Sequence, residues 1–530
     1  MYVESVPNRN SPPAVLLRES FRQNGRVKKR TLANLSCWRP VRVEALRRAL
    51  RGEFDQLPAT PVCGPVFGLL FALKQLADEL GLTAALGRTR AAKLALFLVL
   101  ARLAHQGSRL SAVRWAADQA VAEVLGLGAF DEDDLYAALD DLSARQVKIE
   151  QALYRHYLER RGAPPSLLLY DVTSSYFEGL HNALGEYGYN RDGKRGKKQI
   201  VIGLLADDQG EPLAVRVFAG NRNDPTTVPD QIRIVKEQFG VEELVFVGDR
   251  GMVKSKGKQA LGEAGLRYIT ALTDPQIRRR LSEGVLQLEL FAEQVCEVEA
   301  DGVRYVLRLN ESEAKRQRQR LEDKLAKLGG KLDRRNQKVT ASSRCEPAAG
   351  LRQLKPWLAR HKLTELVELR LQGRTLVVER QQAAIEQALE LAGCYVVVTD
   401  VASERMSGQR VHDHYVSLQR VERDFRQLKT GLLEVRPIFV RKESRTRGHV
   451  LCSMLALKLS RELERRIQAA FGTTDDDPHA ITLPDALAAL GRLCLLEYRV
   501  DEQTSVTRLP IPDARQTEIL NALGVSLPHK

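Results

Sequence analysis

Two largely apolar runs, each carrying one acid, constrain the fold of this chain more than any other feature. The run Leu167–Val172 is interrupted by Asp171, and the run Glu243–Asp249 ends in Asp249. Such runs are typical of strands that are buried on both faces of a sheet. Because an unpaired buried carboxylate is costly, each acid requires a compensating partner. The sequence therefore predicts two central strands with an acid near the carboxyl end of each.

The segments around these runs alternate between strand and helix. The first run is followed by two strand-like segments, which are separated by the turn composition of Asp207–Pro212. Three strands in a meander and then alternating helices and strands predict a mixed α/β sheet. The other expected strands span 199–206, 213–219, 268–272 and 394–400, and the expected helices span 226–239, 254–264, 411–430 and 449–470.

The balance of charge favours a polyanionic partner. The chain has 530 residues, with 81 Lys and Arg against 67 Asp and Glu, a net charge of +14 and a pI near 9.4. Nucleic acid is the first candidate partner, and a basic surface that serves only solubility is the alternative. The first residues lack the apolar run of a secretory signal, and the most apolar stretch, Leu94–Ala101, is too short to span a bilayer. We therefore expect a cytoplasmic protein with no membrane segment.

Composition shifts divide the chain into six segments. Residues 1–60 are polar and basic, and they form either a DNA-contacting arm or an irregular packed lead-in. Leucines at helical spacing predict a helical domain over residues 61–160. The sheet core is expected at 161–275 and 391–470, an insertion of strands and charged helices at 276–390, and a helical tail at 471–530.

Asp171 and Asp249 are candidate metal ligands. Adjacent strands would bring the two carboxylates together, and their repulsion would oppose ionisation of both. A divalent cation relieves that repulsion, and Mg²⁺ suits carboxylate oxygens while keeping water positions open for a phosphate. The alternative for either acid alone is an ordinary strand-end or turn residue. The seven cysteines are dispersed with no C-x-x-C pair, which argues against a disulfide framework or a zinc site.

A third acid lies in the expected helix 411–430. Tyr415, Glu422 and Lys429 recur every seven residues, and two turns of helix take about 7.2 residues, so the three are predicted to share one face. Arg426 flanks that face. A carboxylate beside a hydroxyl and cations suits a metal ligand with neighbouring phosphate contacts. The alternative is a surface helix on which Glu422 and Arg426 form an i,i+4 pair.

Polar residues near these acids have less specific patterns. A basic segment around the turn Asp192-Gly193 is expected to follow a DNA backbone, or else to be an exposed, solubilising turn. Its cations are Arg191, Lys194, Arg195, Lys197 and Lys198. His412 and His414 are interpreted as helix-entry residues rather than metal ligands. Glu178 and Asp400 are spare acids that we expect near the site.

Taken in order, the segments Tyr170–Gly179, Gly248–Met252 and Tyr415–Lys429 resemble bacterial insertion-sequence DDE transposases. Specifically, they are similar to the insertion-sequence-four superfamily, which has a Y-R-E-K signature around its third acid. The segments Tyr187–Gln199 and Phe218–Pro225 share this likeness. One departure concerns the signature Arg, whose position holds Leu418. Arg426 is a better geometric substitute for it than Arg420, which points away from Glu422.

The resemblance implies a ribonuclease-H-like mixed sheet core with a β-rich and helical insertion before the third acid. It implies that Asp171, Asp249 and Glu422 are catalytic and hold Mg²⁺ or Mn²⁺, as two ions. Tyr415, Arg426, Lys429 and Arg250 would contact phosphates. The partners would be the terminal inverted repeats of an element and target DNA, bound by a homodimer with its helical domain on the ends. The alternatives are a ribonuclease-H-like nuclease without strand transfer and a decayed, non-catalytic DNA-binding protein.

Overall fold

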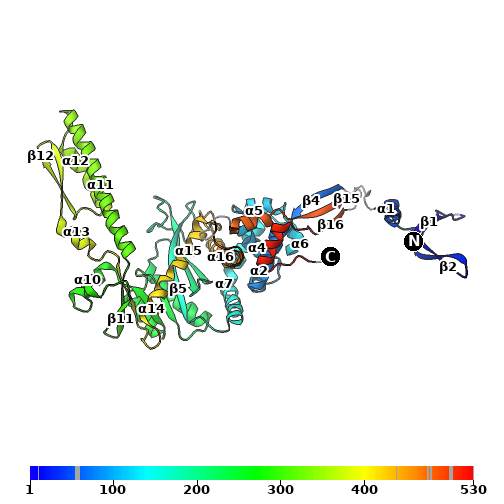
Figure 1. Ribbon diagram of the computed structural model, residues 1–530, viewed down its shortest axis with the longest axis horizontal. Helices are drawn as coiled ribbons and strands as arrows, with labels where there is room; N and C mark the ends of the chain where they lie inside the picture. The colour runs from blue at the N-terminus through cyan, green and yellow to red at the C-terminus, as the bar shows by residue number, and fades with distance from the viewer. Residues whose placement is uncertain are drawn as a thin grey trace. The chain divides into compact units, whose positions relative to one another are not determined.

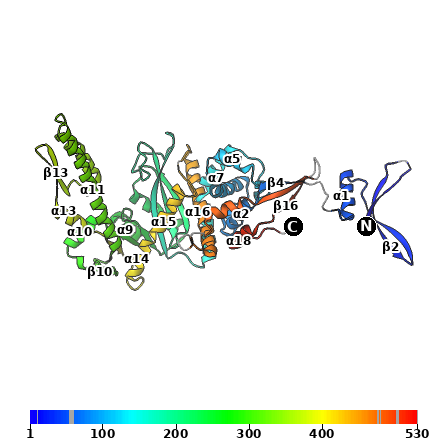
Figure 2. The same ribbon diagram turned by 45° about the horizontal axis from the view of Figure 1, so that its top comes forward.

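The computed structural model describes residues 1–9, 11–53, 60–436, 438–473, 477, 480–499 and 505–528. They form two compact units, one of Met1–Ala138 with Leu459–Lys530 and the other of Leu139–Lys458. The long helices α7 (Glu132–Arg161) and α16 (Glu443–Phe471) run across the two divisions (Figures 1 and 2). The units therefore divide within helices.

The second unit is built on an eight-stranded mixed sheet with the order β10-β11-β14-β9-β8-β5-β6-β7. Strands β5, β8 and β9 are parallel, and β5, β6 and β7 form an antiparallel meander. The predicted mixed α/β fold is confirmed, with the two acid-bearing strands adjacent at its centre. The strands are β5 (Leu167–Tyr176), β6 (Gln199–Asp207), β7 (Pro212–Ala219), β8 (Val245–Gly248), β9 (Arg267–Ala271), β10 (Cys296–Ala300), β11 (Val303–Leu309) and β14 (Cys394–Thr399).

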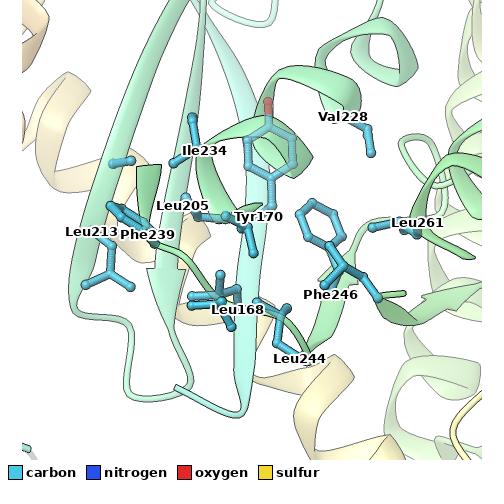
Figure 3. Packing of buried hydrophobic residues seen from close by; sticks show 14 of the residues in the cluster. Leu168, Tyr170, Leu205, Leu213, Val228, Ile234, Phe239, Leu244, Phe246 and Leu261 are labelled. Carbon is cyan, nitrogen blue, oxygen red and sulfur yellow. The ribbon is translucent and has the colours of Figure 1, made fainter. Parts of the chain in front are cut away.

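Helices cover this sheet and bury its apolar side chains. Tyr170 and Phe246, from neighbouring strands, are fully buried with ring centroids 5.7 Å apart (Figure 3). The Tyr170 hydroxyl donates to Thr227 at 2.9 Å, and a Cβ on Gly203 would lie 2.5 Å from that hydroxyl, so the position requires glycine. The helical segment that follows β7 comprises η2 (Asp224–Thr227), α8 (Val228–Arg233) and the π-turn η3 (Ile234–Gln238), and α9 (Ser255–Glu263) follows β8.

The segment expected as an insertion is partly continuous with the main sheet. Its strands β10 and β11 extend the sheet edge through pairing of β11 with β14. Residues 321–389 pack around a separate apolar core, which includes Leu328, Leu358 and Leu363, whereas residues 277–291 pack with β11 and β14. The segment's other elements are α10 (Asp274–Ser282), η4 (Leu288–Leu290), α11 (Glu311–Ala341), α12 (Ala348–His361), β12 (Val367–Gln372), β13 (Thr375–Arg380) and α13 (Gln382–Leu389).

The first unit contains more strands than the sequence analysis expected. The described part of the basic N-terminal segment is a three-stranded antiparallel sheet of β1 (Tyr2–Val6), β2 (Ala14–Gln23) and β3 (Arg26–Asn34), followed by α1 (Pro40–Leu50), so it is not irregular. The tail predicted as helical contributes β15 (Cys494–Arg499) and β16 (Ser505–Arg508), and β15 pairs with β4 (Thr60–Val66). The alternating residues of Cys494–Arg499 form this strand once a partner is present.

The rest of the first unit is helical. Its helices are α2 (Gly68–Glu79), α3 (Leu82–Leu86), α4 (Arg90–Ala104), α5 (Arg109–Ala116), α6 (Val121–Leu125), α17 (Leu483–Leu490) and α18 (Ala514–Leu523). Leu70, Leu73 and Leu76 of α2 are fully buried, as their helical spacing predicts. Across the described residues, no helix combines the length and apolarity that crossing a membrane requires.

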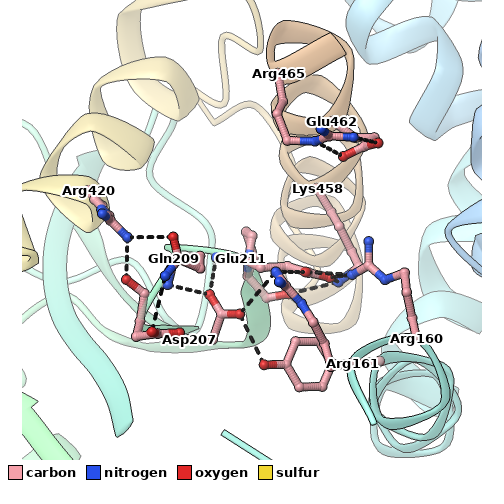
Figure 4. A network of polar contacts seen from close by, with 12 residues as sticks. Arg160, Arg161, Asp207, Gln209, Glu211, Arg420, Lys458, Glu462 and Arg465 are labelled. Carbon is pink, nitrogen blue, oxygen red and sulfur yellow. Dashed lines mark hydrogen bonds and ion pairs between the residues drawn. The ribbon is translucent and has the colours of Figure 1, made fainter. Parts of the chain in front are cut away.

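A buried ion network joins the β6–β7 turn to the two long helices. Glu211, in that turn, accepts hydrogen bonds from Lys458 of α16 and, at 2.5 Å, from Arg160 of α7 (Figure 4). The side chains of Glu211 and Lys458 are 13% and 5% exposed. Asp207 accepts a hydrogen bond from the Tyr157 hydroxyl at 3.1 Å. Ion pairs as well as packing therefore fix the β6–β7 turn.

Candidate active site

Asp171 and Asp249 lie at matched positions of adjacent strands. The parallel register of β5 and β8 pairs Tyr170 with Gly248, and each acid follows its paired residue. The paired residues of the two strands are buried, apart from the half-buried Val245. The two acids therefore reach the same edge of the sheet, as the sequence predicted.

Glu422 reaches the same place from a helix. It lies on α15 (Leu418–Thr430), which packs on β5. Asp171, Asp249 and Glu422 together line a cavity of about 810 Å³ and a smaller adjoining one of about 270 Å³. Within the described ranges, no three His, Cys, Asp or Glu side chains are arranged to hold a metal ion. The three acids thus share one cavity without forming a closed chelating cluster.

The carboxyl of Asp171 is protonated more readily than an ordinary one. Burial and, to a smaller extent, the nearby charges of Asp249 and Glu422 raise its pKa to about 7. A hydrogen bond from the Val172 amide, at 2.7 Å, and the charge of Arg191 oppose this rise. The repulsion among acids that the sequence analysis anticipated is therefore present in the site.

This raised pKa gives a test of the metal-free protein. An acid whose pKa is higher in the folded state binds more protons there, so stability falls as the pH rises from about 4, its unfolded pKa, to about 7. We expect Asp171→Asn to remove this loss, which is on the order of 3 kcal/mol. The measurement is urea unfolding of both proteins in EDTA at pH 5 and pH 8. Equal pH dependence of the two proteins would contradict the assignment.

The helix expected at 411–430 is in fact two helices. α14 (Gly408–Val416) and α15 meet at Ser417, whose hydroxyl donates to the carbonyl of His414 at 2.6 Å. A serine that bonds a carbonyl of the preceding turn competes with helix continuation. Tyr415 and Glu422 therefore lie on different helices, and the argument that placed them on one helix face was wrong.

Tyr415 nevertheless lines the cavity, where its side chain contacts Asp249. Its hydroxyl donates to Asp249 Oδ1 at 3.2 Å. Burial raises the pKa of Tyr415 well above its usual value, and Asp249 adds to that rise. The tyrosine therefore remains a donor and orients the Asp249 carboxylate.

Lys429 contacts the basic segment and does not line the cavity. Its Nζ lies 3.0 Å from Asp192 Oδ1, and Arg436 bonds the same oxygen. The Asp192 side chain is 2% exposed and also accepts from the Tyr176 amide at 2.9 Å. The predicted Asp192-Gly193 turn is thus a buried anchor, which ties the segment between β5 and β6 to the end of the Glu422 helix.

Removing the charge of this anchor should loosen the basic segment. In Asp192→Asn, the side chain keeps its shape but Lys429 and Arg436 lose their counter-ion, so we expect a loss of about 1.5–3 kcal/mol in stability. Trypsin should then cut between Arg191 and Lys198 faster than in the unchanged protein. Asp208→Asn, in the neighbouring turn, is the control. Identical rates of cleavage for all three proteins would show that Asp192 does not fix the segment.

The predicted DNA-contacting cations differ in their surroundings. Arg191 pairs with Asp224 at 2.5 Å and Lys197 pairs with Glu178 at 2.5 Å, while Arg250 lies 3.8 Å from Asp274. Lys194 and Lys198 lie over the rings of Tyr176 and Tyr187. Arg195 and Arg426 are exposed and form no ion pair within the described part of the chain. The exposed cations remain candidates for DNA contact.

Two further positions qualify the sequence analysis. Leu418, at the signature Arg position, is buried against the cavity, and Arg420 donates to Gln209 in the β6–β7 turn (Figure 4).

Asp400 accepts a hydrogen bond from the Tyr268 amide at the start of β9. Because β14 is antiparallel to β9, Asp400 lies at the opposite end of the sheet from the acids, and its expected place near the site was wrong.

The sequence analysis missed one group in the cavity wall. Arg308, Tyr395 and His412 line the cavity together with the three acids. His412 is buried, and both other side chains hydrogen-bond to it, so it is not a solvated helix-entry residue. Asp192 was also missed, although a single acid inside a run of cations was a usable signal.

The comparisons with known proteins agree with this geometry. A family model described as a transposase DDE domain matches residues 162–459, more than half of the chain. The chain belongs to the DDE transposase family. A second model, described as the N-terminal domain of IS1634 family transposases, matches residues 3–60. This transposase is therefore an enzyme that cleaves DNA and transfers strands. Membership of the insertion-sequence-four superfamily stays a prediction.

Solved structures of transposases are distant from this chain. The piggyBac transposase, in a synaptic complex with hairpin DNA, is 10% identical with a TM-score of 0.36, over 76% of each chain. The Mos1 transposase, in a paired-end complex with the left transposon end, is 10% identical with a TM-score of 0.15, over 34% of this chain and 58% of that one. No curated protein matches the chain. The assignment therefore depends on the family models.

Proposed function

We propose that this transposase cuts DNA at the ends of its own insertion sequence and joins those ends to target DNA, with Asp171, Asp249 and Glu422 as its catalytic acids. The observation that supports the proposal is that the three acids, far apart in sequence, line one cavity of a DDE transposase fold. A cavity open to solvent suits a substrate that enters sideways, as a DNA strand does.

The donor set fits a hard divalent cation. All three acids offer carboxylate oxygens, which Mg²⁺ and Mn²⁺ prefer. The pKa of Asp171 is raised mainly by burial, and a cation would offset the smaller contribution from the charges of Asp249 and Glu422. Bound as two ions, the metal would supply activation of water and charge stabilisation at the leaving oxygen. The protein's own side chains position the acids. Tyr415 orients Asp249, and Asp192 fixes the Glu422 helix against the strand of Asp171.

The DNA would be held by cations around this cavity. Arg195, Lys194, Lys198, Arg426 and Arg250 are exposed enough to contact backbone phosphates, whereas Lys429, Arg191 and Lys197 first need to leave carboxylate partners. We also propose that the helical domain of residues 61–160 binds the terminal repeats. A homodimer would pair two ends, and the reaction would take place on cytoplasmic, nucleoid DNA.

The test uses purified full-length protein and two labelled duplexes. One duplex carries the inverted repeat that borders the reading frame with flanking DNA, and the other carries internal sequence of the same length. With Mg²⁺, we expect nicks at the repeat boundary and products joined to a target plasmid, and neither with EDTA. Cutting without joined product would favour the ribonuclease-H-like nuclease, and metal-independent binding alone would favour the decayed DNA-binding protein.

A further inference from the structure

The cavity has a charge distribution that its three acids do not explain. Its lining holds five carboxylates, from Asp171, Asp249, Glu293, Glu311 and Glu422. Among the lining residues, one guanidinium, that of Arg308, opposes them. A DNA strand brings a negative charge at every phosphate, so a strand in this cavity meets strong repulsion wherever no cation faces it.

Two side chains, those of His412 and Tyr395, hold Arg308 in place. Arg308 lies on β11 and is the register partner of Tyr395 on β14. Its Nη1 lies 3.0 Å from His412 Nε2 and 3.2 Å from Nδ1, and the Tyr395 hydroxyl bonds the same ring. His412 Nδ1 is 3.0 Å from Asp413 Oδ1, so in the tautomer that donates to Asp413 the one lone pair of Nε2 is shared between the Tyr395 hydroxyl and Arg308 Nη1.

The guanidinium is oriented by His412 and Tyr395, and Asp413 attracts it without forming an ion pair. Within the described part of the chain, Arg308 forms no ion pair with a carboxylate. Arg304, on the same strand, differs: its side chain is 5% exposed and pairs with Glu297 at 2.5 Å. An arginine offers five N–H donors in a planar fork. Nη1 of Arg308 faces the His412 ring, and its guanidinium also bonds to the Tyr395 hydroxyl. The remaining donors are available to an anion in the cavity.

We propose that Arg308 binds a backbone phosphate of the DNA strand that enters this cavity, next to the phosphodiester that is cut. This inference rests on the proposed function, because it takes DNA as the ligand. Guanidinium and phosphate match as a bidentate, charge-assisted pair.

The experiment combines two variants with single neutral phosphates. Arg308→Gln removes the charge, Arg308→Lys keeps it without the fork, and Arg267→Gln, on β9 of the same sheet and lining a different cavity, is the control. Each protein is given end duplexes in which one phosphate at a time, near the cut, is a methylphosphonate. We expect Arg308→Gln to lower kcat/KM for cleavage by about 10–100-fold, mainly through KM, with a smaller loss for Arg308→Lys.

The position of the loss identifies the contact. At one phosphate, or two neighbouring ones, the methylphosphonate should lower kcat/KM of the unchanged protein by as much as the Arg308→Gln substitution does. At the same position it should not lower kcat/KM of the Arg308→Gln variant any further. If the loss from the substitution and the loss from the methylphosphonate multiply at every position, Arg308 stabilises the protein without contacting a phosphate, and the proposal is wrong. It is also wrong if Arg308→Gln cleaves like the control. Absence of cleavage by the unchanged protein would instead overturn the proposed function.

Discussion

Replacing Asp171, Asp249 or Glu422 by its amide is expected to lower Mg²⁺-dependent cleavage of the end duplex by about 1,000-fold or more for each variant. The amide keeps the volume of the side chain but loses the charge that holds a cation. Because the three carboxylates line one cavity and act together, the double variants should lose little beyond the single ones. Single-turnover cleavage rates, measured at saturating Mg²⁺, give the comparison.

The control for this series is Asp400→Asn. Asp400 is also an acid that follows a strand of the same sheet, but it lies at the sheet's opposite end, so its amide should cleave within about twofold of the unchanged protein. Binding of the end duplex in EDTA should survive in all four variants, since no carboxylate is needed to attract DNA. If one of the three amide variants cleaves normally, the residue replaced in it is not a catalytic acid, and the site assignment fails.

The strands that carry the first two acids could be predicted because the evidence for them is local. Unbroken apolar runs specify buried strands, and the order of turn and helix signals specifies how the strands connect. The register that pairs Tyr170 with Gly248 is set only when the two strands meet. Glu422 was singled out as the candidate third acid by the resemblance to DDE transposases, because the spacing argument for its helix face was wrong.

The contacts of the polar side chains could not be predicted in the same way. Whether Ser417 continues or ends a helix depends on where its hydroxyl finds an acceptor, and the seven-residue spacing of Tyr415 and Glu422 carries no information about that. Lys429 meets Asp192 from 237 residues away. Period-2 alternation turns Arg308 to one face of its strand, but its partner Tyr395 lies on a strand that pairs only after folding.

These long-range contacts share a consequence for how the site works. Asp192 fixes the end of the Glu422 helix, while Tyr415 and His412, both on α14, contact Asp249 and Arg308, so the site is held by polar contacts as well as by the apolar core. Such contacts keep their geometry only if the sheet beneath them is rigid. The ion network on the β6–β7 turn is part of that support, because Arg420, two residues before Glu422, donates to the same turn.

Replacing Glu211 by alanine should destabilise the protein by about 3–5 kcal/mol, because it leaves the buried Lys458 without its counter-ion. Burial opposes the charge of Glu211, but Lys458 and Arg160 outweigh it and hold the pKa of Glu211 below its usual range. An acid with a lowered folded pKa stabilises the protein above its unfolded pKa, near 4.5, and this contribution is lost as the pH falls further. The cost of Glu211→Ala should therefore be largest near neutral pH.

Lys458 gives the second half of this test. Burial lowers the pKa of Lys458, so in Glu211→Ala the amine can lose its proton, and part of the stability should return as the pH rises towards 9. Adding Lys458→Met to Glu211→Ala removes the unpaired charge and should restore most of the loss at neutral pH. The control is Glu443→Ala on α16, whose exposed pair with Arg447 is worth less than about 0.5 kcal/mol. Urea unfolding at pH 7 and pH 9 measures all four proteins, and equal midpoints for Glu211→Ala and Glu443→Ala would contradict a buried, mutually compensating pair.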